Sequence, residues 1–572
     1  MLIDLTQDNL YVSLCSQKLR ADKTGYIEIL DDLARNGHVF QTLSAPRGLG
    51  VSTFLDMLNA FYGDRYQSLI FADTAVSRNA ALMTRRGAFF ELAFDFAEIN
   101  ATTGYNDIIT RLCEETFRVM KTVFPGQGRH KTEYDFAKCL LAISRIAGKK
   151  LVITFKNFDR VQRYAIKQLN ILTAWQRLFA QIQQLNLRED FIYLLVAGAH
   201  IPGMTELLVN PENPDRRLFF SLTEKNSPRA DDMYGWCGIT QEELTYILQG
   251  SMSDLDEGDL YDWCGHYGQA LMRPASVFAS IAEHDFIMTV NIDSGLWYIR
   301  DILEAGYGSF LLCGEIGVAR LLNGESVSMH QLSECDSRKS TQYAAEIYSF
   351  TRRFLNMLSG EGLITVTGQF GGKLDNAEIA NRETQLSVSD ALSEDSGSYV
   401  SQLCRIAAGR TRLAEAFASG EARSFADLLV SYLNFKRAFL NRNAALRISI
   451  WQGIYDLLTD LDGYELRAVN DVFVLRNLNA DDDYLLICVA VNADMAALIN
   501  GVVNIRLTSS RARRALDGYK GRLEAFVYQL TISPDTAIPV KAECQKVLVV
   551  QAEVRGVLLY SPPSLSLVLS VI

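Results

Sequence analysis

The stretch that most constrains the fold of this chain runs from Phe40 to Leu58, with the sequence FQTLSAPRGLGVSTFLDML. An apolar run, His38 to Leu43, leads into a turn of proline and glycine, Pro46-Arg47-Gly48-Leu49-Gly50, and apolar residues then recur at helical spacing from Phe54 to Leu58. A strand, a glycine turn and a helix in this order cradle a phosphate, because the loop N–H groups and the helix N-terminus face the anion. The stretch therefore predicts an α/β fold with a phosphate loop, the name used below for residues 45–53.

The phosphate loop departs from the full phosphate-binding pattern at two positions. That pattern is G-x-x-x-x-G-K-[ST], and its lysine reaches the β- and γ-phosphates. Here Ala45 stands at the first glycine and Val51 at the lysine. Losing the lysine removes a charge-assisted hydrogen bond worth roughly 1.5–3 kcal/mol. Two interpretations stay open: weak nucleotide binding through the loop, or an inherited turn that only packs. The binding interpretation would use Arg47, Gly48, Gly50, Ser52 and Thr53.

A second apolar run, Leu151 to Phe155, predicts a buried strand at whose end a nucleotide hydrolase would carry two acids. The first acid would hold Mg²⁺ through water, and the second would orient the attacking water. The chain has Lys156 and Asn157 there, and Asp159 comes too late for the metal position. We therefore expect hydrolysis to be lost. As an alternative, Lys156 could swing to the phosphates and replace the missing lysine.

Composition narrows the class of protein. A chain of 572 residues predicts two to four domains, and a net charge of −11 argues weakly against broad non-specific binding of nucleic acid. The ten cysteines are scattered without a C-x-x-C pair and the six histidines are dispersed, so we expect reduced thiols and no metal site. Without a membrane-length apolar run or a secretion leader, the expected location is cytoplasmic, or outside the cell by a route without a cleavable signal peptide.

Three regions follow from the order of the patterns. Strands alternate with helices within residues 1–285, which predicts a parallel sheet. Residues 286–433 have helical periodicity and form a connector, with a polar stretch, Ser387 to Ser398, as an exposed loop. In residues 434–572 we expect strands at Tyr464–Val469, Val472–Leu475, Tyr484–Val491, Val547–Val554 and Val557–Tyr560, and a helix at Ser510–Tyr519.

Seven short motifs carry a resemblance over some 250 residues. They are Asp22-Lys23-Thr24, Ala45 to Ser52, Phe94-Asp95-Phe96, Phe158-Asp159-Arg160, Gly238 to Leu244, Trp263 to Tyr267 and Arg273 to Val277. In this order they resemble bacterial AAA-ATPase-like proteins that carry a C-terminal PD-(D/E)XK nuclease-like domain. The resemblance implies an N-terminal AAA-like parallel sheet, a helical connector and a restriction-endonuclease-like α/β domain. It also places His200 where such ATPases keep a polar sensor, although a loop histidine is the simpler interpretation.

The resemblance implies a second active site in the C-terminal domain. A nuclease of this class needs an acid on its second strand and E-x-K on its third, because two carboxylates hold the metal and the lysine orients water. Asp471 stands near the first position, but Cys488 and Ala490 occupy the other two, and no lysine occurs between Lys436 and Lys520. A single carboxylate is a poor Mg²⁺ site.

Both expected active sites therefore lack the charged residues of their chemistry, so we expect no catalytic residues and no metal site. The favoured function is that of an inactive ATPase-like and nuclease-like protein that binds a protein partner as scaffold, inhibitor or effector. No cofactor is required, although weak ATP or ADP binding stays open, and the basic run Arg511 to Arg514 leaves a weaker case for nucleic acid. The alternative is a nucleotide-dependent nuclease or a nucleotide-sensing ATPase that uses non-standard residues.

Overall fold

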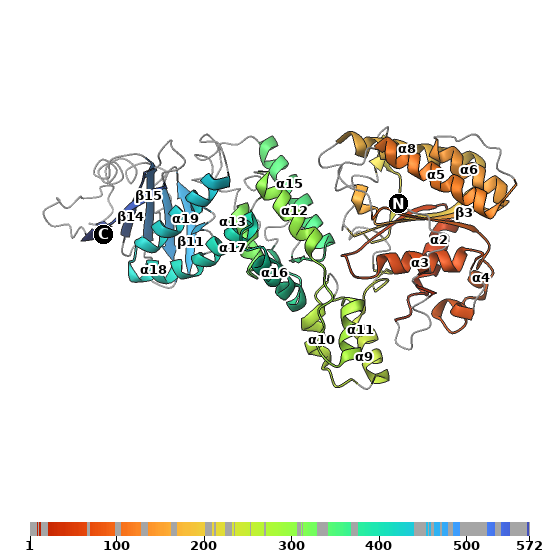
Figure 1. Ribbon diagram of the computed structural model, residues 1–572, viewed down its shortest axis with the longest axis horizontal. Coiled ribbons are helices and arrows are strands. Elements are labelled where there is room, and N and C mark those ends of the chain that lie inside the picture. Colours follow the sequence, from red (N-terminus) through yellow and green to blue (C-terminus); the bar gives the residue numbers. More distant parts are fainter. Residues whose placement is uncertain are drawn as a thin grey trace. The chain divides into compact units, whose positions relative to one another are not determined.

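The computed structural model in Figure 1 describes most of the chain. The described residues are 21–65, 69–97, 105–126, 135–161, 169–200, 209–210, 213–223, 231–233, 235–251, 253–267, 270–305, 311, 313–328, 341–367, 376–439, 454–455, 457–458, 461, 463–469, 472–478, 484–491, 523–531, 539–549 and 569–570, together with Asn9, Tyr11 and Val12. The chain divides into two units. The first contains Met1–Asn291 with Asn356–Thr365 and Ala380–Thr384, and the second contains Ile292–Leu355, Val366–Ile379 and Gln385–Ile572.

A five-stranded parallel sheet forms the centre of the first unit, which confirms the α/β prediction. Its strand order is β2-β3-β4-β1-β7. The strands are β1 (Phe40–Ser44), β2 (Phe90–Asp95), β3 (Leu151–Lys156), β4 (Ile192–Ala199) and β7 (Phe220–Ser221). Ser44 pairs with Ala199, and Phe155 pairs with Ala197. The carboxyl ends of β1, β3 and β4 therefore meet at one edge of the sheet.

Helices cover both faces of this sheet, as Figure 1 shows. One face carries α2 (Tyr26–Arg35) and α3 (Val51–Tyr62), and the other carries α5 (Tyr105–Val123), α6 (Phe136–Ala147) and α8 (Leu169–Glu189). Successive residues of β3 enter opposite cores: Val152 packs with α2 and α3, and Ile153 packs with α5, α6 and α8. Burial on both faces explains why these strands are continuous apolar runs rather than alternating ones.

Short elements complete the sheet region. They are η1 (Leu69–Phe71), η2 (Ala75–Arg78), α4 (Ala80–Met83) and the hairpin strands β5 (Val209–Asn210) and β6 (Asn213–Arg217). The motif at Asp22 fixes one of them, since Asp22 accepts the N–H of Ala75 at 2.6 Å and Thr24 accepts that of Val76 at 3.1 Å. This motif therefore positions a neighbouring loop.

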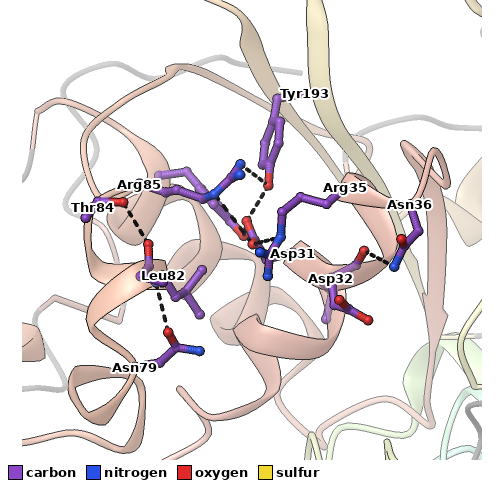
Figure 2. Close-up of polar contacts among 12 residues, drawn as sticks. Asp31, Asp32, Arg35, Asn36, Asn79, Leu82, Thr84, Arg85 and Tyr193 are labelled. Atoms are coloured by element: carbon purple, nitrogen blue, oxygen red, sulfur yellow. Dashed lines mark hydrogen bonds and ion pairs between the residues drawn. The ribbon is translucent and has the colours of Figure 1, made fainter.

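A buried carboxylate ties α2 to the amino end of β4, the end of the strand away from the phosphate loop. Figure 2 shows Tyr193, Arg85 and Arg35 directed at Asp31. Tyr193 donates to Asp31, Arg85 donates to the Tyr193 hydroxyl at 2.6 Å, and Nε of Arg35 lies 2.9 Å from Oδ2 of Asp31. Burial raises the pKa of Tyr193, so it stays a neutral donor at physiological pH.

A separate three-helix group follows the sheet and has a small core of its own. It consists of α9 (Gln241–Gly250), α10 (Glu257–Cys264) and α11 (Pro274–Glu283). Thr240 and Glu243 form a reciprocal capping box at the start of α9, which satisfies two N–H groups of its first turn. Lys23 anchors this group to the sheet region, because its Nζ lies 2.5 Å from Glu243 and 2.7 Å from the carbonyl of Gly235.

The second unit begins with helices, in keeping with the helical pattern of the middle region. Its elements up to the last sheet are α12 (Asp293–Glu304), α13 (Gly314–Leu322), β8 (Val327–Ser328), α15 (Thr341–Gly360), β9 (Ile364–Thr367), β10 (Asn376–Ile379), α16 (Arg382–Glu394), α17 (Tyr399–Gly409), η4 (Arg410–Arg412), α18 (Leu413–Ser419) and α19 (Arg423–Phe439). Of these, α15, β9 and α16 each contribute a few residues to the first unit. Strand β8 pairs with β10 in antiparallel fashion.

The prediction of an exposed loop at Ser387 to Ser398 is wrong, because most of that stretch belongs to the helix α16. Asn381 accepts the N–H of Thr384 at 3.0 Å and so caps the helix start, and Val388 is buried on its inner face. Ser398 in turn accepts the N–H of Ser401 and caps α17. The polar residues of this stretch therefore cap helices and cover an exposed face.

The last part of the chain forms a six-stranded sheet of order β11-β12-β13-β14-β15-β16. The strands are β11 (Tyr464–Val469), β12 (Val472–Asn477), β13 (Tyr484–Val491), β14 (Leu523–Thr531), β15 (Lys541–Val549) and β16 (Leu569–Ser570). The first three are antiparallel and agree with the expected strands, whereas β13 and β14 are parallel. The pattern missed β14, and the strand expected from Val547 begins earlier, at Lys541. The helix expected at 510–519 and the strand at 557–560 lie outside the described residues.

Within the described ranges, no helix has both the length and the apolar character needed to cross a bilayer.

Candidate functional site at the phosphate loop

The phosphate loop has the backbone of an anion cradle. It follows β1 directly and ends where α3 begins at Val51. Gly48 has φ +88° and Gly50 has φ +92°, a left-handed conformation that L side chains rarely adopt, so both positions need glycine. The start of α3 has no side-chain cap. Over the described part of the chain, the N–H groups of Gly48, Gly50, Val51 and Ser52 meet no acceptor, and such groups suit an anion.

Val51, at the lysine position, is a core residue. Its side chain is 1% exposed and packs against Gly198 of β4. A Cβ added to Gly198 would come 3.0 Å from Cγ1 of Val51 and 2.6 Å from Cδ1 of Leu55, so β4 and α3 are in close contact here. The position that supplies a cation in the full pattern therefore supplies packing in this chain. Ser52 and Thr53 follow it and are both partly exposed.

Lys156, at the end of β3, forms an ion pair with Asp56 of α3. The two side chains are 15% and 12% exposed, so the pair is largely removed from water. Asp56 lies four residues after Ser52, and residues at this spacing share a helix face. The structure thus places the lysine beside α3, one turn beyond Ser52. The alternative in which Lys156 reaches the phosphates would require it to leave this partner.

Polar side chains join the carboxyl ends of β2, β3 and β4. Asn157 has φ +52°, which turns the chain sharply after β3. Its amide nitrogen donates to Asp95 at 2.7 Å, and its amide oxygen lies 3.0 Å from Nε2 of His200. His200 also donates its backbone N–H to Asp159 at 3.4 Å. His200 therefore belongs to a buried network at the strand ends, where the resemblance placed a polar sensor.

Arg47 connects the phosphate loop to two buried carboxylates. Its Nε lies 2.9 Å from Oε2 of Glu361, and its Nη2 lies 4.0 Å from Oδ2 of Asp159. Glu361 is 3% exposed and Asp159 is fully buried. The acid that comes too late for the metal position is thus paired with the loop arginine.

Arg273, at the start of α11, brings a second guanidinium to the loop. It is 5% exposed, and Nη2 donates to the hydroxyl of Tyr267 at 2.6 Å. A Cβ on Gly48 would come 2.9 Å from Nε of Arg273, so this nitrogen is aimed at the loop. Nε has no hydrogen-bond acceptor, and no carboxylate in the described region forms an ion pair with this guanidinium. The N–H of Gly238 also donates to the carbonyl of Leu49 at 2.7 Å, which docks the three-helix group on the loop.

Two of these site residues were not candidates from the sequence. Arg273 had a detectable signal, because an arginine directly before a proline at a helix start is part of the quoted motifs. Glu361 had none, since it lies more than 300 positions after Arg47 and its neighbours form no phosphate-binding pattern. Their place at the loop depends on tertiary packing.

The candidate residues of the C-terminal sheet are described less fully. Asp471 lies outside the described residues, between the end of β11 at Val469 and the start of β12 at Val472. Cys488 and Ala490 belong to β13, where the backbone of Cys488 pairs with Val472. Across the described residues, no three His, Cys, Asp or Glu side chains gather as ligands for a metal ion.

Comparisons with known proteins relate the N-terminal part of the chain to a known family. No curated protein matches the chain. A solved structure of the Aeropyrum pernix ORC2 protein, in ADPNP–ADP complexes, is 12% identical and covers 64% of this chain and 93% of its own, but its TM-score of 0.25 is too low to support an argument. Residues 16–191, which include the phosphate loop and strands β1, β2 and β3, match the family model described as predicted AAA-ATPase, so this part of the chain is AAA-ATPase-like.

Proposed function

We propose that this chain is a catalytically inactive ATPase-like and nuclease-like protein that acts by binding a protein partner, as scaffold, inhibitor or effector. The ion pair between Lys156 and Asp56 is the observation that carries the proposal. Mg²⁺ prefers carboxylate oxygens and water as ligands. An ammonium group at the end of β3 places positive charge where a hydrolase needs a cation-binding acid, and its partner Asp56 is already neutralised.

Val51 supports the same proposal. A residue buried between α3 and Gly198 cannot stabilise the charge that develops on a transferring phosphoryl group. The two replacements remove different requirements of one phosphoryl-transfer step, since one removes the phosphate contact and the other removes the metal contact. The parallel sheet and its core are intact although both contacts are missing. This is expected of a protein that acts by binding rather than by hydrolysis.

Phosphate release from ATP, measured with Mg²⁺ and with Mn²⁺, tests the loss of ATPase activity. We expect the purified chain and its Ser52→Ala variant to release phosphate at the same rate as the buffer blank. A rate above the blank that disappears in Ser52→Ala would overturn the proposal. The nuclease half has a parallel assay, in which cutting of plasmid DNA that depends on Asp471 would show a surviving second site.

Arg273 favours a second candidate, a nucleotide-sensing protein that binds without hydrolysis. A buried guanidinium without a carboxylate partner is costly, and a bound phosphate would supply the missing negative charge. Within the described residues, the four N–H groups without acceptors belong to the loop that this guanidinium approaches. Binding of this kind would use amides and arginines and would not depend on a metal.

Titration with ATP and ADP in the presence of EDTA tests this candidate. Losing a hydrogen bond to a charged group costs about 1.5–3 kcal/mol, so we expect Arg273→Met to weaken binding about 10- to 100-fold. Arg177→Met, on an exposed turn of α8, is the matched control and should leave affinity unchanged. Binding that Arg273→Met does not affect, or binding that requires Mg²⁺, would contradict the candidate.

A further inference from the structure

Residues 356–365, named the strap, lie against the phosphate loop. The carbonyl of Gly360 accepts the N–H of Arg47 at 2.7 Å, and Glu361 accepts Nε of the same arginine at 2.9 Å. Gly362 has φ +73°, and a Cβ there would come 2.9 Å from Nη2 of Arg273 and 3.2 Å from the carbonyl oxygen of Arg47. The strap therefore uses one loop N–H group and lies beside both arginines of the site.

The charges around Arg47 show what the strap does to the loop. Glu361 is the nearer of its two carboxylates, at 2.9 Å against 4.0 Å for Asp159. Both carboxylates are buried, so water screens their charges weakly. A phosphate bound to the loop would need the same guanidinium and would add negative charge close to Glu361. The strap and a phosphate therefore compete for Arg47.

Resting on the proposed nucleotide binding, we propose that the strap is an internal competitor for the phosphate loop, with the Glu361 carboxylate in the place on Arg47 that a nucleotide phosphate would take. The competition is reciprocal, since an anion that displaces Glu361 frees the strap. The strap is joined to the second unit at both of its ends, Leu355 and Val366. Binding of a phosphate to the loop would thus loosen a segment through which the chain passes between its units.

Glu361→Gln in the full chain tests the competition directly. The substitution keeps an oxygen that can accept from Arg47 but removes the negative charge. We expect ATP, titrated in EDTA, to bind Glu361→Gln about tenfold more tightly than the unchanged chain, because an ion pair no longer opposes it. Glu28→Gln, on an exposed position of α2, is the matched control and should bind like the unchanged chain.

A second variant and a second measurement do not depend on the Glu361 side chain. Gly362→Ala strains a left-handed turn and brings a Cβ 3.2 Å from the carbonyl oxygen of Arg47, so strap amides should exchange faster in this variant than in the unchanged chain. Its ATP affinity is not a readout, because the same Cβ comes 2.9 Å from Nη2 of Arg273. In the unchanged chain, hydrogen exchange of the strap amides should speed up when ATP is added.

The outcomes separate this inference from the proposed nucleotide binding. Tighter binding in Glu361→Gln, with faster exchange in the strap on adding ATP, supports the competition. Equal affinity in Glu361→Gln and the unchanged chain, or slower exchange in the strap on adding ATP, overturns the competition and leaves nucleotide binding standing. No binding of ATP by any of the chains overturns both.

Discussion

At the residue scale, a few charged side chains decide what the phosphate-loop edge of the sheet can do. Lys156 and Asp56 neutralise each other where a metal would be held, and Arg47 is shared by Glu361 and Asp159. Arg273 alone among these charges has no counter-ion within the described part of the chain. Arg273 is therefore the cation at this edge with which a bound anion could pair, and the proposed nucleotide binding depends on it.

Lys156→Met tests whether this ion pair is structural. The substitution removes the ammonium group from beside the largely buried Asp56 carboxylate, so we expect it to lower the free energy of unfolding by about 2–3 kcal/mol. The matched control is Lys138→Met, whose lysine is more than half exposed and pairs with Asp135 on the surface, where the loss should stay below about 1 kcal/mol. Urea unfolding measures both. Equal losses in the two variants would contradict a structural pair, and a fall in ATP affinity in Lys156→Met would support the alternative in which Lys156 contacts phosphate.

Glu91, near the start of β2, gives stability a pH dependence. Burial raises the pKa of Glu91 from 4.5 to about 7. The Arg65 guanidinium, whose Nε lies 2.8 Å from Oε1 of Glu91, lowers this pKa and so partly opposes the effect of burial. A raised folded pKa means that the native state binds the proton more tightly, so this residue lowers stability as the pH rises from about 4.5 to about 7. The full effect is at most about 3 kcal/mol.

We expect Glu91→Gln to remove this part of the pH dependence, because an amide does not titrate. Urea midpoints between pH 4.5 and pH 8 should fall less steeply for Glu91→Gln than for the unchanged chain, and Glu28→Gln should follow the unchanged chain. Parallel curves for Glu91→Gln and the unchanged chain would show that Glu91 titrates normally.

At the element scale, buried polar side chains hold three helices of the second unit together. Nζ of Lys436, on α19, lies 2.8 Å from Glu315 of α13 and donates to the hydroxyl of Tyr399 on α17 at 2.9 Å. Tyr399 donates to Glu315 at 2.8 Å, and Tyr432 donates to the same carboxylate. Lys436 is the last lysine before the C-terminal sheet, and its ammonium is engaged with Glu315 and Tyr399, so it does not replace the lysine missing from β13.

Lys436→Met should destabilise the second unit strongly. It leaves the Glu315 carboxylate buried without a cation, which costs about 3–5 kcal/mol. Arg405→Met, on the exposed face of α17, is the control and should change stability by less than about 0.5 kcal/mol. Thermal unfolding followed by near-ultraviolet circular dichroism measures the effect. A loss no larger than that of Arg405→Met would mean that the cluster contributes little.

Elements were predictable from the sequence where the pattern was local. The strand, loop and helix from Phe40 to Leu58 and the strands of β11 to β13 have periodicities that a single stretch reveals. Helix α16 was missed because its capping residue, Asn381, lies outside the polar run that suggested a loop. Strand β14 was missed although its residues are mostly apolar; its parallel partner β13 ends more than 30 positions earlier in the sequence, so no local hairpin pattern marks this pairing.

At the scale of the whole molecule, the chain leaves the first unit and returns to it twice, and no sequence pattern predicts this. The strap reaches Arg47, and Glu383, in the second returning segment, is fully buried and accepts from Ser276 and from the N–H groups of Thr289 and Val290. Each contact joins residues roughly a hundred or more positions apart. The sequence alone shows that Val51 and Lys156 stand where other residues are expected. Their contacts with Gly198 and Asp56 can be identified only in the folded structure.

The division into two units leads to the last prediction, that the chain unfolds in two calorimetric transitions. Glu383→Ala removes the carboxylate that holds the second returning segment to α11, so it should lower the midpoint of the first unit's transition by several degrees and leave the other unchanged. Lys436→Met should do the reverse, because its partners all lie in the second unit. A single transition that both variants lower equally would show that the returning segments couple the two units into one cooperative structure. In that case, release of the strap would change the stability of the second unit, in addition to loosening the chain segment that joins the two units.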